Sequence, residues 1–161
     1  MMMNNIDEFS IFVASSAELK SERDELSDLM LDMNEKLEEK GIKMKSVQWE
    51  FMDSSMGKKD KEDEYLERLK ECEICIVLFW QILGKYTVEE LNVAVEEMIV
   101  GRLPRRVCVL YKESAEDISE ELKKFKMNFY KKYKDIPVFT FTGMNNLREK
   151  VETVIVEHFM M

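Results

Sequence analysis

Short apolar runs alternate along this chain with longer segments in which apolar residues recur every three or four positions. Runs rich in β-branched and aromatic residues predict strands. We expect strands at residues 9–14, 42–49, 74–80, 106–111 and 136–141. The run from 74 to 80 consists of seven apolar residues, which indicates a strand buried on both faces and makes it the centre of the predicted fold.

Helical spacing appears between these runs. After the first run, an apolar stripe predicts a long helix that ends at Gly41, and its members are Leu19, Leu26, Met30, Met33 and Leu37. Further helices are expected around residues 65–69, from 87 to 101, after 117 and over 147–159.

Local signals suggest where the helices start. Capping-box patterns at residues 15–18, 87–90 and 114–117 predict three helix starts. The polar segment 50–63 is expected to form an exposed loop before the second helix. Loops of this length in small domains are often functional.

Five strands alternating with five helices require right-handed crossovers and a parallel sheet with helices on both faces. We expect a single α/β domain over residues 1–161, flavodoxin-like, with three layers and strand order 2-1-3-4-5. Pro137 cannot donate a ladder hydrogen bond, which favours an edge position for the fifth strand. We also expect this domain to belong to a longer protein.

Charge and composition narrow the class of protein. A net charge of -9 at pH 7 argues against direct binding to the phosphates of nucleic acid. No apolar run approaches the roughly 18 residues that suggest a membrane helix, and the start of the chain lacks the features of a signal peptide. We therefore expect a cytoplasmic protein without membrane contact.

The three cysteines include one C-x-x-C pair, Cys72 and Cys75. A zinc or redox motif needs exposed cysteines with partner ligands. Here Cys75 and Cys108 lie inside apolar runs, and His158 is the only histidine. We therefore expect the cysteines to be core side chains, His158 to have a packing or surface role, and no metal site.

The predicted strand order places the first and third strands side by side, and ligands of open α/β sheets bind where such strands end. Residues that follow the first three strands should meet at this edge of the sheet. The expected substrate-binding residues are Ser15, Ser16, Trp49, Asp53, Trp80, Gly84 and Tyr86. One carboxylate, Glu90, lies in the helix after the third strand and completes the site.

Hydroxyls, aromatic rings and one carboxylate suit a nucleoside ligand. An aromatic ring can stack on a base, and Glu90 can accept from ribose hydroxyls or stabilise a developing oxocarbenium charge. No dinucleotide, P-loop, hydrolase or metal-ligand motif competes in this sequence. Glu90 also completes the capping box that begins at Thr87, so a catalytic role and a helix-capping role are both open at this point.

The segment from Tyr86 to Ala94 resembles a TIR (Toll/interleukin receptor) domain of the bacterial kind. The family pattern has an aromatic residue a few positions before a Glu-Leu pair and an Ala four positions after that Glu, and Tyr86, Glu90, Leu91 and Ala94 match it. The resemblance implies an NAD glycohydrolase with Glu90 as its catalytic residue, NAD as substrate and no required cofactor. It also implies an effector of bacterial antiphage or immune signalling.

The family resemblance also implies partners. The residues 53–57 resemble the BB loop, which gates the nucleotide site and contacts like TIR domains, so a homo-oligomer is expected on activation. Two departures leave the product open: Lys85-Tyr86-Thr87 replaces the usual Ser-x-Trp-Cys, and Ala14-Ser15-Ser16 replaces an opening Ser-Tyr. The alternatives are a non-enzymatic TIR-like module, which associates through residues 50–63 and the helix from Thr87, and a nucleoside deoxyribosyltransferase.

Overall fold

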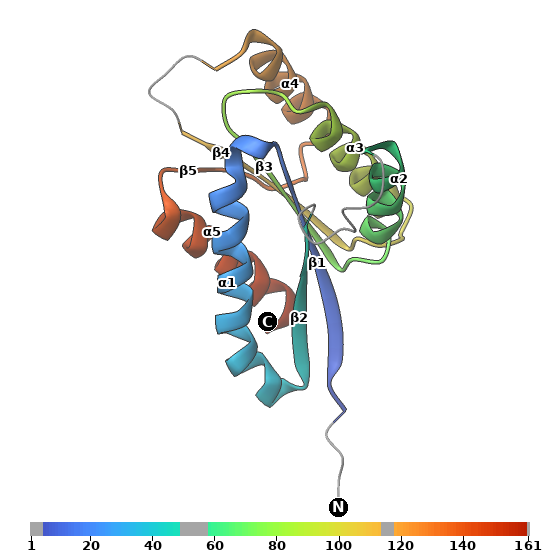
Figure 1. The fold of residues 1–161 in the computed structure, drawn as a ribbon, viewed down its shortest axis with the longest axis vertical. Coiled ribbons are helices and arrows are strands. Elements are labelled where there is room, and N and C mark those ends of the chain that lie inside the picture. The colour runs from blue at the N-terminus through green and yellow to red at the C-terminus, as the bar shows by residue number, and fades with distance from the viewer. Residues whose placement is uncertain (1–4, 49–57, 114–117, 161) are drawn as a thin grey trace, which may run out of the picture.

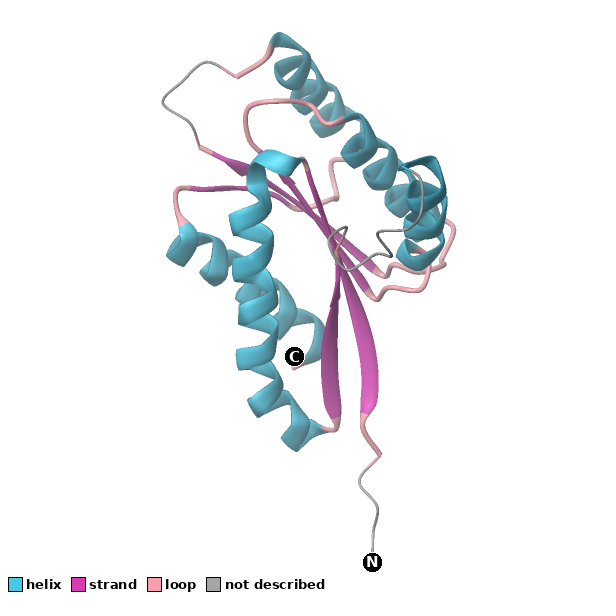
Figure 2. Ribbon diagram, viewed as in Figure 1, coloured by secondary structure: helices cyan, strands magenta, loops and turns pink. Residues whose placement is uncertain are grey.

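A five-stranded, all-parallel sheet forms the centre of the molecule (Figures 1 and 2). The computed structural model describes residues 5–48, 58–113 and 118–160. The strand order is β2-β1-β3-β4-β5, which confirms the flavodoxin-like α/β fold expected from the sequence. The strands are β1 (Asp7–Ser15), β2 (Ile42–Val47), β3 (Ile74–Phe79), β4 (Arg106–Lys112) and β5 (Val138–Phe141).

The central strand β3 is buried along its whole length, as its apolar run predicts. It pairs with β1 in a register that sets Ser15 beside Leu78, so the two strands end at the same edge of the sheet. The edge position expected for the fifth strand is also confirmed. β5 begins at Val138, two residues later than predicted, because Pro137 has no N–H to donate to the ladder.

Helices cover both faces of the sheet and make three layers (Figure 1). One core cluster lies between the sheet and the helices α1 (Lys20–Leu37) and α5 (Met144–Phe159). The other lies under α2 (Lys58–Leu69), α3 (Lys85–Ile99) and α4 (Glu120–Lys132). Short 3₁₀ turns, Ala17–Leu19 and Glu38–Lys40, flank α1, and Gly41 ends this segment at a φ of 75°. The apolar stripe predicted for α1 is buried throughout.

Two of the predicted helix starts are wrong. Ser15, the predicted N-cap, is the last residue of β1. Ser16 precedes the 3₁₀ turn without a side-chain capping hydrogen bond, and α1 begins only at Lys20. α3 begins at Lys85 with Gly84 before it, so Thr87 lies inside the first turn and cannot cap it. The predicted capping box of Thr87 and Glu90 is therefore not formed.

Residues 58–63, expected to belong to an exposed loop over 50–63, are helical, and residues 50–57 lie outside the described ranges. α2 begins at Lys58, because the sequence from 58 to 69 is rich in strong helix formers with charges of both signs. The pattern at 114–117 lies outside the described residues. α4 begins after Ser119, whose Oγ accepts from the Leu122 N–H at 3.1 Å.

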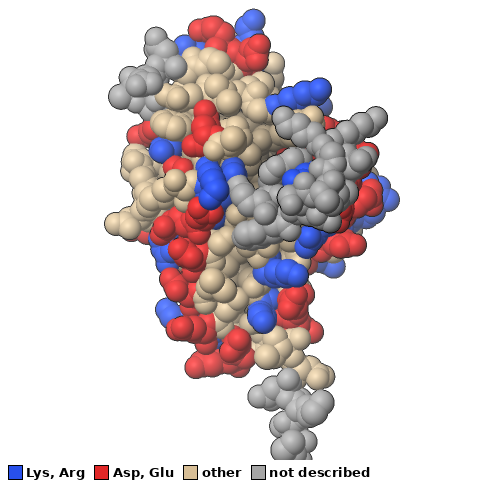
Figure 3. Space-filling model, viewed as in Figure 1, with Lys and Arg blue, Asp and Glu red and all other residues tan. Residues whose placement is uncertain are grey.

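The surface is acidic with interspersed basic side chains, in line with the net charge of -9 (Figure 3). Along α1 the exposed acidic residues include Asp24, Asp28 and Glu35. All three cysteines are free and buried, and burial raises the pKa of the Cys72 and Cys108 thiols to about 12. Within the described ranges, no group of three potential metal ligands occurs, and no helix combines the length and apolar character needed to cross a bilayer.

Candidate functional site

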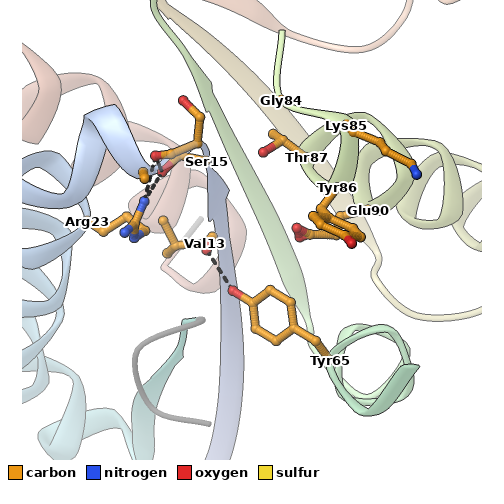
Figure 4. Close-up of a pocket in the computed structure, with 11 residues that line it drawn as sticks. Val13, Ser15, Arg23, Tyr65, Gly84, Lys85, Tyr86, Thr87 and Glu90 are labelled. Atoms are coloured by element: carbon orange, nitrogen blue, oxygen red, sulfur yellow. Dashed lines mark hydrogen bonds between the residues drawn. The ribbon is translucent and has the colours of Figure 1, made fainter. Parts of the chain in front are cut away.

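A cavity of about 270 Å³ lies where β1 ends and α3 begins (Figure 4). Five of the predicted site residues line it, namely Ser15, Ser16, Gly84, Tyr86 and Glu90. The other lining residues are Val13, Ala17, Arg23, Tyr65, Lys85 and Thr87. The structure thus brings the residues after the first and third strands together, as the strand order predicts.

The β1 side of the cavity is held by a buried guanidinium. Arg23 is only 5% exposed, and its Nη1 donates to the Ser15 Oγ and, at 2.8 Å, to the Ser16 carbonyl (Figure 4). The Ser15 hydroxyl in turn donates to the same carbonyl at 3.1 Å. These bonds fix the turn that leaves β1 and place a positive charge at the cavity wall.

Tyr65 of α2 forms a second wall. Its hydroxyl donates to the Val13 carbonyl of β1 at 3.1 Å, and its ring lies 4.3 Å from the Phe12 ring between centroids. The side chain is buried, so this bond joins α2 to the sheet directly below the cavity. Figure 4 shows that Tyr65 lies on the same side of β1 as Tyr86 and Glu90 of α3.

Gly84 brings the loop after β3 close to the turn after β1. A Cβ atom at this position would lie 3.1 Å from the Thr87 Oγ1 and 3.4 Å from the Ser16 Cβ, so even an alanine would require the Thr87 side chain to shift. Tyr86 follows at the cavity mouth with 36% of its surface exposed, and the Lys85 Nζ lies 5.9 Å from its ring centroid. Tyr86 thus presents part of an aromatic ring beside a cation at the cavity mouth.

Glu18 holds the same loop from the other side. Its Oε1 accepts from the backbone N–H groups of Gln81 at 2.8 Å and Ile82 at 3.3 Å. The Gln81 carbonyl accepts from the Ser119 N–H at 3.1 Å. The side chain expected to cap its own helix is therefore used to join two loops that are distant in sequence.

Glu90 is the buried acid of the cavity. Its side chain is 3% exposed, and its Oε2 has no hydrogen-bond partner among the described residues. Burial is the main cause that raises the pKa of Glu90 well above its usual value, followed by the charges of Glu62 and Glu89, while Arg23 opposes the shift. A carboxyl in such surroundings keeps its proton at a pH where an exposed glutamate has lost it.

Trp80 lies on the opposite face of the sheet from Glu90. It packs against the core under α1 and α5, and the Lys112 Nζ lies 4.1 Å from its ring centroid. Phe79, the last residue of β3, packs under α3 and α4, and successive strand residues alternate between faces. Trp80 is therefore not among the lining residues of the cavity. Trp49 and Asp53 lie outside the described residues.

Arg23 and Tyr65 are among the six lining residues that were not predicted from the sequence. A recognisable signal exists for Arg23, because it lies four residues after Leu19 and three before Leu26, on the apolar stripe of α1. A charged residue at a core-facing position needs a buried partner or a functional reason. Glu62, three residues before Tyr65 in α2, carries the same signal.

No family model matches this chain, and no curated protein matches it. Among solved structures, it is similar to rubredoxin oxygen:oxidoreductase from Desulfovibrio gigas, with a TM-score of 0.46 and 8% identity over 93% of this chain and 35% of that one. It is also similar to the Flv1 flavodiiron core from Synechocystis sp. PCC6803, with a TM-score of 0.43 and 8% identity over 94% of this chain and 37% of that one. The chain thus spans about a third of each.

Proposed function

We propose that this domain cleaves the N-glycosidic bond of NAD, releasing nicotinamide, with Glu90 as its catalytic carboxylate. The observation that carries the proposal is the placement of Glu90 in the cavity, buried and with an oxygen that lacks a hydrogen-bond partner in the described structure. A helix cap would leave that oxygen bonded to backbone N–H groups, whereas α3 begins five residues earlier. The resemblance of residues 86–94 to TIR domains supports the same role.

The chemistry needs one carboxylate. The nicotinamide ring of NAD is positively charged, so when the C1′–N bond breaks its electron pair neutralises the ring and no acid is needed. Positive charge then develops at C1′ and O4′ of the ribose, where an ionised Glu90 stabilises it. Water adds to C1′ and loses a proton, which gives ADP-ribose, or a nitrogen of the adenine adds instead and gives a cyclic product.

Other cavity residues have supporting roles in this proposal. Tyr86 offers an exposed ring for stacking, and Lys85 places a positive charge at the mouth where a diphosphate would lie. A cationic nicotinamide beside Glu90 favours its ionised form, which offsets the effect of burial on its pKa. Association with like domains, expected from residues 50–63, is part of the same proposal for an immune effector.

The test is to incubate concentrated protein with NAD and to follow nicotinamide by chromatography. Glu90→Gln keeps the size and shape of the side chain but cannot carry the charge, so we expect release to fall by about a thousand-fold or more. Glu89→Gln is the matched control, because Glu89 is exposed on the same helix and should retain activity. Urea unfolding of both variants checks that the fold is kept.

Three other results would change the assignment. Turnover retained in Glu90→Gln would remove this residue from the mechanism. Exchange of a nucleoside base for a free nucleobase, without NAD cleavage, would indicate a deoxyribosyltransferase. No product from a sample shown to be assembled would favour the non-enzymatic module.

A further inference from the structure

A second buried carboxyl lies on α2, the helix that packs beside α3 with its Glu90. Glu62 of α2 is only 4% exposed, and neither of its side-chain oxygens has a hydrogen-bond partner in the part of the chain that the structure describes. Burying a carboxylate without a partner is costly, and such groups are rare unless they are paired or protonated. Two of them on neighbouring helices call for a common explanation.

The position of Glu62 follows from the helix that carries it. It lies one turn before Tyr65, so the two side chains share a face of α2. Tyr65 is anchored to the Val13 carbonyl and lines the cavity. The face of α2 that carries Glu62 is therefore the one that packs toward β1 and the cavity, beside α3 with Glu90.

We propose that Glu62 and Glu90 form one coupled carboxyl pair that holds a single negative charge while the cavity is empty, and that Glu62 thereby sets the pH at which Glu90 ionises. The inference rests on the proposed function for its catalytic consequence. Its physical core, the coupling of two buried acids, does not depend on which ligand the cavity binds.

The charges around the pair support this assignment. Burial raises the pKa of Glu62 to about 7, with smaller contributions from Glu89 and Asp63. The pKa of Glu90 is raised by burial and then by the Glu62 charge. From α1, Arg23 lowers the pKa of Glu90, and the positive charge of one guanidinium balances one carboxylate.

Two further titratable groups belong to the elements around the pair. The Cys75 thiol of β3 is near Glu90, and burial followed by neighbouring charges raises its pKa well above the usual value, so it stays neutral. Lys85 of α3 lines the cavity but its side chain is exposed to solvent. Neither supplies a buried positive charge that would let both carboxyls ionise.

The pair gives the cavity a preference among ligands. A cationic ring placed beside Glu90 favours loss of the second proton, which passes to solvent as the ligand binds. A neutral ring of the same shape gives no such gain. The pair therefore selects N-glycosides with a cationic leaving group, such as NAD, over neutral analogues such as NADH.

The coupling can be measured without any ligand. Protein labelled with ¹³C at the glutamate carboxyl carbons is titrated by NMR, and the two signals are assigned by their loss in Glu62→Gln and Glu90→Gln. We expect the Glu90 midpoint to fall by about one pH unit in Glu62→Gln, and the Glu62 midpoint to fall reciprocally in Glu90→Gln. Glu89→Gln, an exposed neighbour, should shift the Glu90 midpoint less.

The pH profile of activity is a second measurement, and a purely structural role of Glu62 would not shift it. If nicotinamide release needs ionised Glu90, lowering the pKa of Glu90 moves the acid limb of the pH profile to lower pH. Below the wild-type limb, the activity of Glu62→Gln should therefore exceed that of the wild type.

An unchanged Glu90 midpoint in Glu62→Gln together with an unchanged Glu62 midpoint in Glu90→Gln would overturn the pair. If Glu62→Gln does not fold, the Glu90→Gln titration alone decides. Coupled midpoints without nicotinamide release would keep the pair and reject the proposed function.

Discussion

Ionisable side chains are half-buried at the amino end of the parallel sheet and fully buried at its carboxyl end, and their surroundings differ. At the amino end, Arg106 Nε donates to His158 Nδ1 at 3.2 Å, which leaves Nε2 to donate to Glu73 at 2.9 Å. Arg105 lies 3.4 Å from the same Glu73 oxygen. At the carboxyl end, Glu62 and Glu90 bury oxygens that have no hydrogen-bond partner within the described residues.

The difference separates stability from function. Half-buried Glu73 is bonded to His158 of α5, which is bonded in turn to Arg106 of β4. Such a chain of bonds is typical of a structural network, in line with the packing or surface role expected for His158. Buried carboxyls without partners lower stability and are retained where a ligand completes the site. Replacing a glutamate by glutamine should therefore lower the free energy of unfolding at the amino end, and leave it unchanged or raise it at the carboxyl end.

The largest expected effect on stability comes from removing the Glu73 charge. The Glu73 side chain is only 13% exposed, and Glu73→Gln weakens its bonds to His158 and Arg105. This substitution should lower the free energy of unfolding by about 2 kcal/mol. Glu62→Gln, the same substitution at the other end, should be neutral or stabilising at pH 8. Urea unfolding of both variants measures this contrast.

The pH dependence of the Glu62 effect has a definite sign. Its pKa is about 7 in the folded protein and 4.5 as the ordinary value, so the folded state binds more protons in this window. The free energy of unfolding of the wild type therefore falls as pH rises from 4.5 to about 7. Glu62→Gln should reduce this fall. A Glu62→Gln variant destabilised at pH 8 as strongly as Glu73→Gln would contradict the contrast between the two ends.

A smaller effect is expected at Glu18, an acid near the carboxyl end whose carboxylate has hydrogen-bond partners. Glu18→Ala removes the acceptor for two backbone N–H groups and should cost about 1 kcal/mol. Because these bonds hold the loop that leads to Gly84 and Tyr86, the KM for NAD should rise more than kcat falls. Glu18→Gln keeps one acceptor oxygen and is the matched control. Equal kinetics in Glu18→Ala and the wild type would show that the loop is held by other contacts.

The architecture follows from patterns that many residues share. The buried run of β3, the stripe of α1 and the edge position signalled by Pro137 each depend on burial or on backbone chemistry that no distant residue can override. The strand order then places Ser15, Ser16, Gly84, Tyr86 and Glu90 around one cavity. This much of the site is predictable because sheet topology alone brings the strand ends together.

The wrong predictions concern single side chains whose hydrogen-bond partners and packing depend on residues distant in the sequence. Glu18 has the spacing of a capping box, but its carboxylate is bound by N–H groups of the loop after β3. Trp80 continues the apolar run of β3, yet the alternation of strand side chains directs it to the face opposite Glu90. Arg23 and Glu62 could have been found as charges on apolar stripes, but their proximity to Glu90 depends on how three helices pack.

The smallest predicted effect tests the sign of the charges around Glu90. Arg23 lowers the pKa of Glu90, so Arg23→Gln should raise it and move the acid limb of nicotinamide release to higher pH, by less than about one unit. Arg23→Lys keeps the charge while losing the planar fork that binds Ser15 and Ser16, and should leave the limb nearer its wild-type position. Because Glu62→Gln moves the limb the other way, the double variant of Arg23→Gln and Glu62→Gln should lie between the two. If both single variants moved it in the same direction, the shifts would reflect a loosened cavity rather than the charges of Arg23 and Glu62.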